Sequence, residues 1–286
     1  ARLKSEFLQK YHDARGIPLR ERFIANSPDM AAFMAGWKAP IANFFQKTTF
    51  IRFLLEKTVG FDRRRIAPEY ARTPFPQWFK KYHRLNGSSG KSVVLFDDTY
   101  MNFHDTNVGI SALELLESCG YTVILAQAGC CQRPRISHGF LREAKKRGER
   151  TLRNLDSYIS RGLTVVVCEP GCCSALTDDL PDLIDDVALG QRIKDNVMMI
   201  DEFLMRELRS GNLNCDFISH FRSVLIHGHC HQKALYGTSA MKSILERVPG
   251  MKVRVIDSGC CGMAGSFGYE KEHYDLSMRI GEDTLF

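Results

Sequence analysis

An internal repeat that carries two pairs of adjacent cysteines is the sequence feature that most constrains the fold. Residues 91–100, KSVVLFDDTY, align with residues 222–231, RSVLIHGHCH, at an offset of 131. Residues 121–131, YTVILAQAGCC, align with residues 251–261, MKVRVIDSGCC, at an offset of 130. Each copy is typical of an apolar strand, a loop, a helix and a second apolar strand that ends in Gly-Cys-Cys. The repeat therefore indicates that the thiols occupy matched places in a duplicated architecture.

Composition and charge narrow the class of protein. The chain has 286 residues, 44% hydrophobic and 25% charged, which is ordinary for a globular protein of one large or two modest domains. Its 10 cysteines would suit disulfides only in a secretory setting, and no signal-peptide pattern is present. Its apolar runs are shorter than the roughly 18 residues of a membrane span, so we expect no transmembrane segment. The net charge of +6 is scattered without interleaved aromatic residues, so we expect no nucleic-acid partner.

The first part of the chain, residues 1–88, contains no cysteine and has a sequence pattern typical of helices. We therefore expect a helical amino-terminal linker or docking segment. Large apolar residues recur there at helical spacing, which indicates a helical core or a docking surface rather than a cofactor site. These residues are Phe33, Trp37, Phe44, Phe45, Phe50, Phe53 and Leu54. The segment LNGSSGKS, residues 85–92, predicts a flexible boundary after the helices.

Beyond this boundary, short β-branched runs alternate with amphipathic segments. The runs cover residues 92–96, 122–126, 163–168, 223–227 and 252–256. This order predicts an α/β fold with two duplicated Rossmann-like parallel-sheet halves preceded by the helical segment. We expect a degenerate first cysteine-rich repeat at residues 89–212 and a truncated second repeat at residues 213–286. In such folds ligands bind beyond the carboxyl ends of the strands, where both cysteine pairs lie.

The second repeat has the more complete set of thiols. Cys230 follows one predicted strand, and Cys260 and Cys261 follow the next, so neighbouring strand ends would bring these thiols together. Gly259 and Gly262 flank the pair and permit an irregular loop in which both cysteines face one site. Glycine also lets backbone N–H groups approach inorganic sulfide, so we expect these glycines to contact a bound cluster.

Three thiols are one fewer than an iron–sulfur cluster commonly takes. His229, His231 or a residue outside this sequence must then supply the remaining ligand. The histidines at positions 227, 229 and 231 occupy alternate places, so on an extended segment their side chains would lie on one face. They could then ligate metal, protonate a quinone-like acceptor or hydrogen-bond sulfide. Ordinary structural hydrogen bonding is the alternative. The sequence stops at Phe286, 25 residues after Cys261, and we expect a closing cysteine beyond it.

The first repeat is altered at two positions. Thr99 stands where Cys230 stands in the second repeat, and Gln132 stands where Gly262 stands. A third strand end supplies further cysteines, namely Cys168, Cys172 and Cys173, after the pair Cys130 and Cys131. The first repeat therefore holds a weaker cluster, a different one or none.

Three other interpretations of the cysteines remain open. Free cysteine often packs in a core, which is our interpretation of Cys119 and Cys215, whereas Cys168 suits burial and ligation equally. Structural zinc prefers CxxC spacing, which the chain lacks. A vicinal disulfide switch would not require the Gly-Cys-Cys duplication.

The cysteine pattern resembles the CCG-domain family of cysteine-rich modules. Such modules occur in subunits of heterodisulfide reductase, of anaerobic glycerol-3-phosphate dehydrogenase and of the iron–sulfur systems of glycolate and lactate oxidation. The resemblance covers roughly residues 91–286, and HGHCHQKAL with DSGCCGMAGSFGYEKEHYDLSMRIGEDTLF are its most specific parts. These segments look like the carboxyl-terminal iron–sulfur region of fused FAD-linked oxidases similar to D-lactate, glycolate or D-2-hydroxyglutarate dehydrogenases. The second motif of the family is matched by Cys230, Cys260 and Cys261. Its first motif is matched by Cys130, Cys131 and Cys172.

The resemblance implies electron transfer through a [4Fe-4S] cluster, of either cubane or non-cubane type, from flavin towards a quinone or another carrier. It also implies an FAD-binding oxidase domain and a ferredoxin-type domain upstream, because this chain has no flavin or nicotinamide glycine fingerprint. The fragment alone is then not expected to be catalytic, and its place is the cytoplasm or the inner face of the membrane. A non-redox zinc-binding or scaffolding module and disulfide-reductase catalysis at the cluster are the rival functions.

Overall fold

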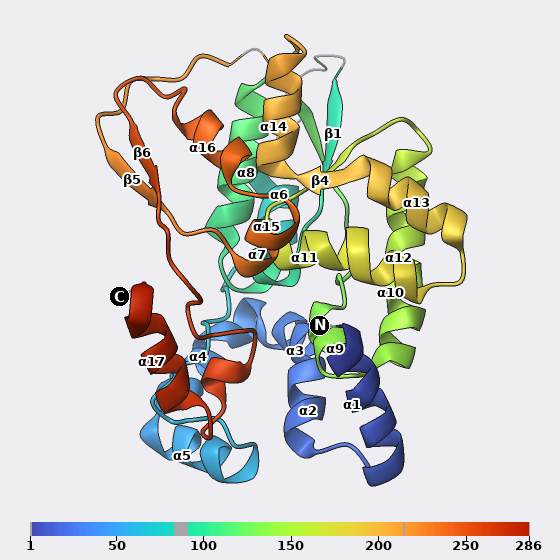
Figure 1. The fold of residues 1–286 in the computed structure, drawn as a ribbon, viewed down its shortest axis with the longest axis vertical. Coiled ribbons are helices and arrows are strands. Elements are labelled where there is room, and N and C mark those ends of the chain that lie inside the picture. The colour runs from blue at the N-terminus through green and yellow to red at the C-terminus, as the bar shows by residue number, and fades with distance from the viewer. Residues whose placement is uncertain (1, 83–90, 214, 286) are drawn as a thin grey trace.

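The computed structural model describes residues 2–82, 91–213 and 215–285, and it confirms the predicted α/β class. Parallel sheets lie among helices, and the helices of residues 2–58 lie beneath them (Figure 1). The predicted boundary at residues 85–92 falls mostly on residues 83–90, which lie outside the described residues. Among the helices that the structure describes, none has the length and apolar character needed to cross a membrane.

The main sheet has four parallel strands in the order β2-β1-β3-β4. The strands are β1 (Ser92–Leu95), β2 (Thr122–Leu125), β3 (Val165–Val167) and β4 (Val197–Met199). The first three match predicted runs, whereas the sequence analysis missed β4. The sequence of β4, Val-Met-Met, is only three residues long and lies directly between two helices, so it shows no strand periodicity.

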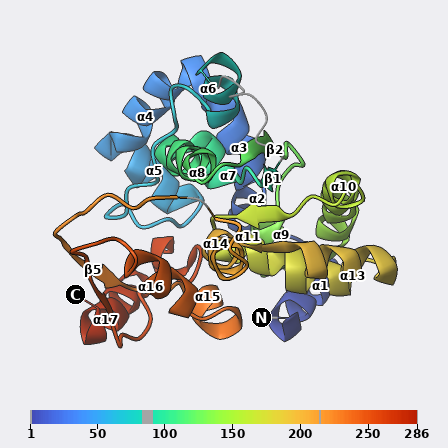
Figure 2. The same ribbon diagram turned by 90° about the horizontal axis from the view of Figure 1, so that it is seen from above.

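Helices cover both faces of this sheet because its apolar side chains alternate between the faces. Val94 and Phe96 pack towards α10 (Leu141–Ile159) and α13 (Val187–Asn196). Val93 and Leu95 pack towards α8 (Thr106–Ser118) and α14 (Ile200–Arg209). Figure 2 shows α8 and α10 on opposite sides of β1 and β2. The connecting helices are α7 (Thr99–Phe103), α9 (Arg133–Ser137), α11 (Pro170–Ser174), the π-helix η2 (Ala175–Asp179) and α12 (Leu180–Leu183).

The second repeat contains a separate sheet of two parallel strands, β5 (Ser223–Ile226) and β6 (Lys252–Val255). Ser223 pairs with Lys252, just as Ser92 pairs with Thr122 in the first sheet. The offsets seen in the sequence therefore hold in the strand pairing. Its helices are α15 (Cys230–Leu235), α16 (Ser239–Leu245), the 3-10 helix η3 (Phe267–Tyr269) and α17 (Tyr274–Thr284).

The segment before α17 pairs with the amino-terminal segment. The 3-10 helix η3 ends at Tyr269, and α17 begins at Tyr274. Asp62 N donates to Tyr269 O at 2.7 Å, and Lys271 N donates to Gly60 O at 3.0 Å. Glu270 forms an antiparallel bridge with Phe61, and residues 271–273 form a turn that leads into α17.

The amino-terminal helices join both repeats. They are α1 (Arg2–Arg15), α2 (Leu19–Ala25), α3 (Ser27–Met34), the 3-10 helix η1 (Gly36–Lys38), α4 (Ala39–Lys47), α5 (Thr49–Thr58) and α6 (Phe75–Tyr82). His138, after α9, contacts Glu21 through Nδ1 and Ser266 Oγ through Nε2 at 3.1 Å. Arg20 also binds Glu272, with an Nη1–Oε2 distance of 2.9 Å. The helical segment therefore contacts the loops that follow both cysteine pairs.

Candidate metal centres

The first group of thiols lies at the carboxyl end of the main sheet. Cys130 and Cys131 follow β2, and Cys172 lies on α11 after β3. The Sγ atoms of Cys131 and Cys172 are 2.8 Å apart, and both side chains are buried. Contact with Cys131, followed by burial, raises the pKa of the Cys130 thiol well above its ordinary value. The structure therefore brings Cys130, Cys131 and Cys172 together.

Gln132 fills a turn position that glycine occupies in the second repeat. Its φ of 64° lies in the left-handed region, which costs a non-glycine residue roughly 1 kcal/mol. Side-chain bonds offset this cost, because Gln132 Nε2 donates to Cys130 O at 2.8 Å and Oε1 accepts from Arg135 at 2.9 Å. The Gln132 amide also points at Cys130 Sγ, 3.4 Å away. The change from glycine therefore leaves the turn intact.

The cysteines near the end of β3 have different surroundings. Glu169 caps α11 and accepts hydrogen bonds from the amides of Gly171 and Cys172, which fixes the start of the helix beside the pair. Cys173 is fully buried and hydrogen-bonds Tyr236, and burial raises its pKa to about 12. Burial likewise raises the pKa of Cys168 to about 12. Cys173, which was predicted as a ligand, thus has Tyr236 as its side-chain partner.

The second group consists of Cys230, Cys260 and Cys261. Burial raises the pKa of Cys230, and the neighbouring charges of Cys260 and Cys261 and a hydrogen bond with Cys260 raise it further. Cys230 is nevertheless exposed and the pair is half-buried, so this group is more open than the first. Gly262 has a φ of 78°, and its amide lies 3.3 Å from Cys260 Sγ.

The two groups have matched geometry. Thr99 begins α7 and hydrogen-bonds Cys130, whereas Cys230 begins α15 and hydrogen-bonds Cys260. In both turns the amide two residues beyond the first cysteine points at that cysteine's sulfur. The alignment of Thr99 with Cys230 therefore describes equivalent positions in space, and the first group has a hydroxyl where the second has a thiol.

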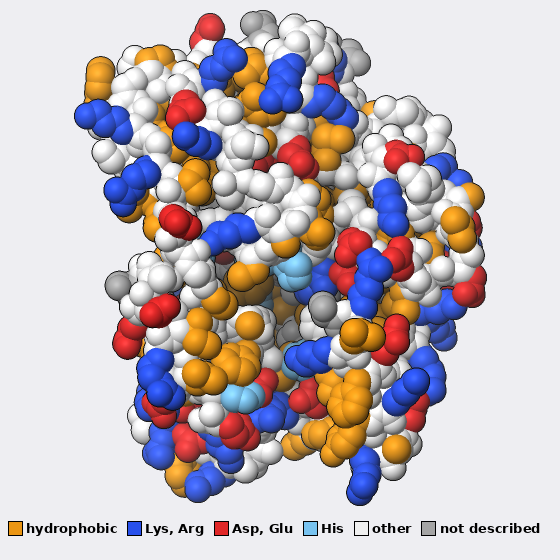
Figure 3. Space-filling model, viewed as in Figure 1, with side chains coloured by type: hydrophobic (Ala, Val, Ile, Leu, Met, Phe, Trp, Pro, Cys, Tyr) orange, Lys and Arg blue, Asp and Glu red, His pale blue; other side chains and the backbone are white. Residues whose placement is uncertain are grey.

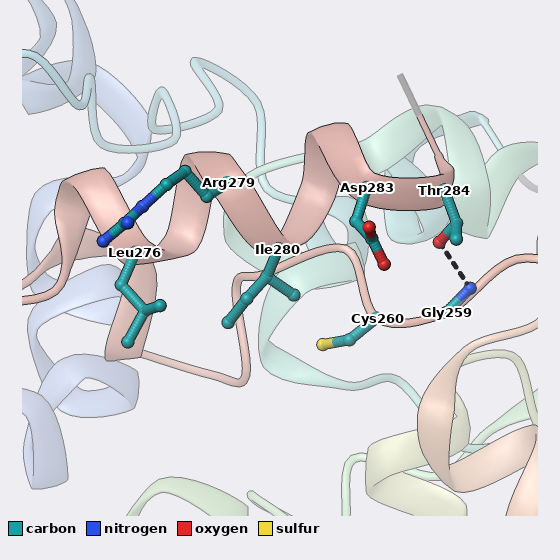
Figure 4. A pocket seen from close by; sticks show the side chains of 7 residues that line it. All are labelled: Gly259, Cys260, Leu276, Arg279, Ile280, Asp283 and Thr284. Atoms are coloured by element: carbon teal, nitrogen blue, oxygen red, sulfur yellow. Dashed lines mark hydrogen bonds between the residues drawn. The ribbon is translucent and has the colours of Figure 1, made fainter.

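A pocket of about 300 Å³ adjoins the second pair. It is lined by Gly259, Cys260, Leu276, Arg279, Ile280, Asp283 and Thr284. Thr284 Oγ1 accepts a hydrogen bond from Gly259 N at 2.7 Å, which holds the end of α17 against the cysteine loop (Figure 4). The Cys260 side chain extends beneath α17 in this view. Gly259 therefore anchors the loop through its amide.

The histidines do not lie on one continuous extended segment, because α15 begins at Cys230, although the rings of His229 and His231 stack with their centres 5.3 Å apart. His229 caps α15 by accepting from the amide of His231 at 3.2 Å, and His227 hydrogen-bonds Ser258 Oγ at 2.6 Å. Burial, followed by the charge of Arg133, lowers the pKa of His231. The buried Nδ1 of His231 has no hydrogen-bond partner among the described residues. Among the described residues, His231 therefore has a ring nitrogen without a hydrogen-bond partner, as His12 and His273 also have.

The two repeats meet near these thiols. Helix α15 packs against α11, and Tyr236, at the end of α15, hydrogen-bonds Thr177 Oγ1 at 2.9 Å. Figure 3 shows that this side of the molecule is hollowed at the level of α11 and α15, with a histidine at the rim. Tyr236 was missed in the sequence, because nothing in its spacing relates it to a cysteine of the first repeat.

No group of three or more histidine, cysteine, aspartate or glutamate side chains among residues 2–82, 91–213 and 215–285 is arranged to hold a metal ion. In the first group the sulfurs of Cys131 and Cys172 contact each other directly. The donor set nevertheless fits an iron–sulfur cluster, which thiolates hold and backbone amides stabilise. The orphaned Nδ1 of His231 is a further donor of the expected kind.

Other cysteines and acids form contacts that the sequence did not reveal. Cys119 is buried in the core, and burial followed by a hydrogen bond with Cys215 raises its pKa to about 12. These two residues were both interpreted as packing residues, and both pack in the core around α8. Burial raises the pKa of Asp98 to about 6. Only the position of Asp98 at a predicted strand end could have indicated its burial.

Comparisons with known proteins support the resemblance to CCG-domain regions of FAD-linked oxidases. The chain is homologous to a subunit of anaerobic glycerol-3-phosphate dehydrogenase of Escherichia coli (strain K12), with 26% identity over 274 residues, covering 95% of this chain and 68% of the relative. D-2-hydroxyglutarate dehydrogenase of the same strain is 27% identical over 294 residues, covering 98% of this chain and 28% of the relative. Lactate utilization protein A of Bacillus velezensis is 27% identical over 206 residues, covering 67% and 83%. No family model and no solved structure matches the chain.

Proposed function

We propose that this chain is an iron–sulfur electron-transfer module of a flavin-dependent dehydrogenase. The observation that carries the proposal is the gathering of three thiols in each repeat around a cysteine pair at matched strand ends. The relatives named above include dehydrogenases of glycerol-3-phosphate and D-2-hydroxyglutarate and a protein of lactate utilization. We therefore assign the module to oxidation of a 2-hydroxyacid such as lactate, glycolate or 2-hydroxyglutarate.

Each thiol group would hold its cofactor through the residues that the structure brings together. Cys230, Cys260 and Cys261 form the second set, and His229 or His231 would supply a further ligand. The first set is Cys130, Cys131 and Cys172. A [4Fe-4S] cluster, cubane or non-cubane, supplies reversible one-electron transfer when bound. The amides of Gln132 and Gly262 point at cysteine sulfur and stabilise the thiolate form.

The electron path needs partners that bind elsewhere. FAD would lie on an upstream oxidase domain, which a ferredoxin-type domain connects to this module, and the acceptor would be a quinone or another carrier. A quinone acceptor would place the module at the inner face of the membrane. The module itself would comprise helical residues 1–88, a first repeat at 89–212 and a second at 213–286.

Anaerobic reconstitution with iron and sulfide, followed by EPR of the reduced protein, tests this function. We expect a cluster signal that Cys230→Ser or Cys261→Ser abolishes or changes in shape. Cys215→Ser is the matched control, because Cys215 lies in the core around α8 and should leave the signal unchanged. A full-length protein with intact thiols that takes up no iron and sulfide would refute the proposal. Stoichiometric zinc without acid-labile sulfide would support the zinc-binding alternative instead.

A further inference from the structure

A set of large apolar side chains on the amino-terminal helices is exposed to solvent. We call it the aromatic face; its members are Phe33, Trp37, Ile41, Phe44, Phe45, Phe50, Phe53 and Leu54. Their exposed fractions range from 41% for Phe53 to 79% for Trp37. Of the two expectations from the sequence, a helical core is therefore wrong for these residues, and a docking surface remains. Contiguous apolar surface of this kind marks an interaction site.

The exposed residues form one stripe on each of two short helices. Ile41, Phe44 and Phe45 follow the i, i+3, i+4 spacing on α4, and residues 50, 53 and 54 repeat that spacing on α5. Helix α5 has no buried residue, although it packs against α4. Figure 1 shows α5 at the lower end of the molecule, beneath α17 and far from β5 and β6. The two helices therefore present apolar stripes that no described part of the chain covers.

Basic side chains accompany the aromatic face. Residues 30–55 include Lys38, Lys47 and Arg52 but no aspartate or glutamate, although the whole chain has 33 acidic and 39 basic residues. Lys38 Nζ lies 3.3 Å from the centre of the Phe33 ring. The two acids that flank this range, Asp29 and Glu56, pair with Arg135 and Arg63. Lys47 pairs with Glu69, so the positive charge of the face rests on Lys38 and Arg52. The face therefore combines exposed aromatic rings with a local excess of positive charge.

We propose that the aromatic face binds the surface of a membrane that contains anionic phospholipid. Interfacial helices bury Phe, Trp and Leu at the boundary of the acyl chains, while Lys and Arg bind lipid phosphate. Helices α4 and α5, of 9 and 10 residues, are too short to cross a bilayer and would lie in its plane. Lys38, placed against the rings of Phe33 and Trp37, suits the headgroup level. This surface deepens the proposed placement at the membrane but is remote from the thiol groups, so it does not depend on cluster binding.

Sedimentation with vesicles tests the proposal directly. The full chain should bind vesicles of phosphatidylcholine and phosphatidylglycerol, bind pure phosphatidylcholine more weakly, and be released as salt is raised. The triple variant Trp37→Ser, Phe44→Ser and Phe50→Ser should lower the partition coefficient at least about tenfold. A matched triple variant removes exposed apolar residues elsewhere and should bind like the wild type. It carries Leu19→Ser, Val187→Ser and Ile218→Ser.

Tryptophan fluorescence provides a second measurement that needs no change to the face. The chain has two tryptophans, and Trp78 packs against the core whereas Trp37 is exposed. In a Trp78→Phe variant the remaining emission should shift to the blue on addition of anionic vesicles and be quenched by brominated lipid. Emission that is unaffected by either would place Trp37 outside the bilayer and overturn the proposal.

Other occupants of the face would produce distinct results. If the protein does not bind anionic vesicles, or if the triple variant binds them as well as the wild type, the proposal is wrong. Concentration-dependent dimerisation that the triple variant abolishes, without vesicle binding, would identify a second copy as the occupant. Because vesicle binding is measured without reference to iron or sulfide, its failure leaves the electron-transfer proposal standing, and the reverse also holds.

Discussion

Replacing Gly262 by alanine should destabilise the second cysteine turn far more than the backbone angle alone explains. Gly262 has a φ of 78°, and a Cβ atom there would lie 2.0 Å from the carbonyl oxygen of Ser277 in α17. Left-handed φ costs alanine roughly 1 kcal/mol relative to glycine. The overlap with a backbone atom requires α17 to shift, which adds about 1–3 kcal/mol. We therefore expect a total loss of about 3 kcal/mol in the free energy of unfolding.

Gly237 supplies a matched control for this variant. It has the same φ of 78°, but no atom lies within 4 Å of the position that its Cβ would take. Gly237→Ala should therefore show the cost of the backbone angle alone, about 1 kcal/mol. The difference between the two variants, about 2 kcal/mol, isolates the contact between the cysteine turn and α17.

Urea unfolding followed by circular dichroism measures both losses, with amide hydrogen exchange in α17 to detect local opening. Gly262→Ala should shift the midpoint well below that of Gly237→Ala and speed exchange in α17. Equal losses, within about 0.5 kcal/mol, and unchanged exchange in α17 would show that the turn and the helix are not in contact as described.

Three further predictions concern the first repeat and its contacts. Thr99→Cys should raise the iron and sulfide taken up on reconstitution, because Thr99 already hydrogen-bonds Cys130 where the second repeat has a thiol; unchanged metal content would contradict the equivalence. Burial raises the pKa of Asp98 to about 6, so folding favours the protonated carboxyl. The free energy of unfolding should therefore be highest below about pH 4 and fall by about 3 kcal/mol as the pH rises through about 6. Asp98→Asn should flatten this slope in urea titrations of cofactor-free protein, whereas an unchanged slope would assign the proton elsewhere. His138→Ala should cost about 1–3 kcal/mol and expose the amino-terminal helices to protease, because it removes bonds to Glu21 and Ser266; unaltered proteolysis would show that this bridge is dispensable.

The repeat could be predicted from sequence because strand pairing preserves its offsets. Ser92 faces Thr122 and Ser223 faces Lys252, so an alignment of apolar runs was also an alignment of paired strands. Burial of the apolar strands in the main sheet follows from the same runs. Among the strands of the described residues, β4 alone was missed, because a strand of three residues between two helices has no period to detect.

What the sequence could not predict is which side of an element is covered. The spacing of Phe44, Phe45 and Phe50 is the same for a core helix and for an exposed docking helix, and only the structure shows that these rings are open to solvent. The backbone around the histidines differs from an extended segment for a related reason. Their alternation implied an extended segment, but His229 caps a helix that begins at Cys230. The local sequence pattern shows which side chains lie on the same side of a helix or strand. Packing between distant segments decides whether that side is buried and which conformation the segment adopts.

The two cysteine groups differ in which matched positions carry cysteine and in how deeply their thiols are buried. The second repeat has a cysteine at each matched position, yet Cys230 is exposed and lies on a two-stranded sheet. The first repeat lacks one thiol, at Thr99, yet Cys131 and Cys172 are buried within a four-stranded α/β core. Because Gln132 keeps its turn through side-chain hydrogen bonds, the first repeat has preserved its framework and changed a single donor. Burial disfavours charged thiolates and shields a bound cofactor from solvent. Any cluster in the first group should therefore be better protected from solvent than one in the second, although each group gathers three thiols.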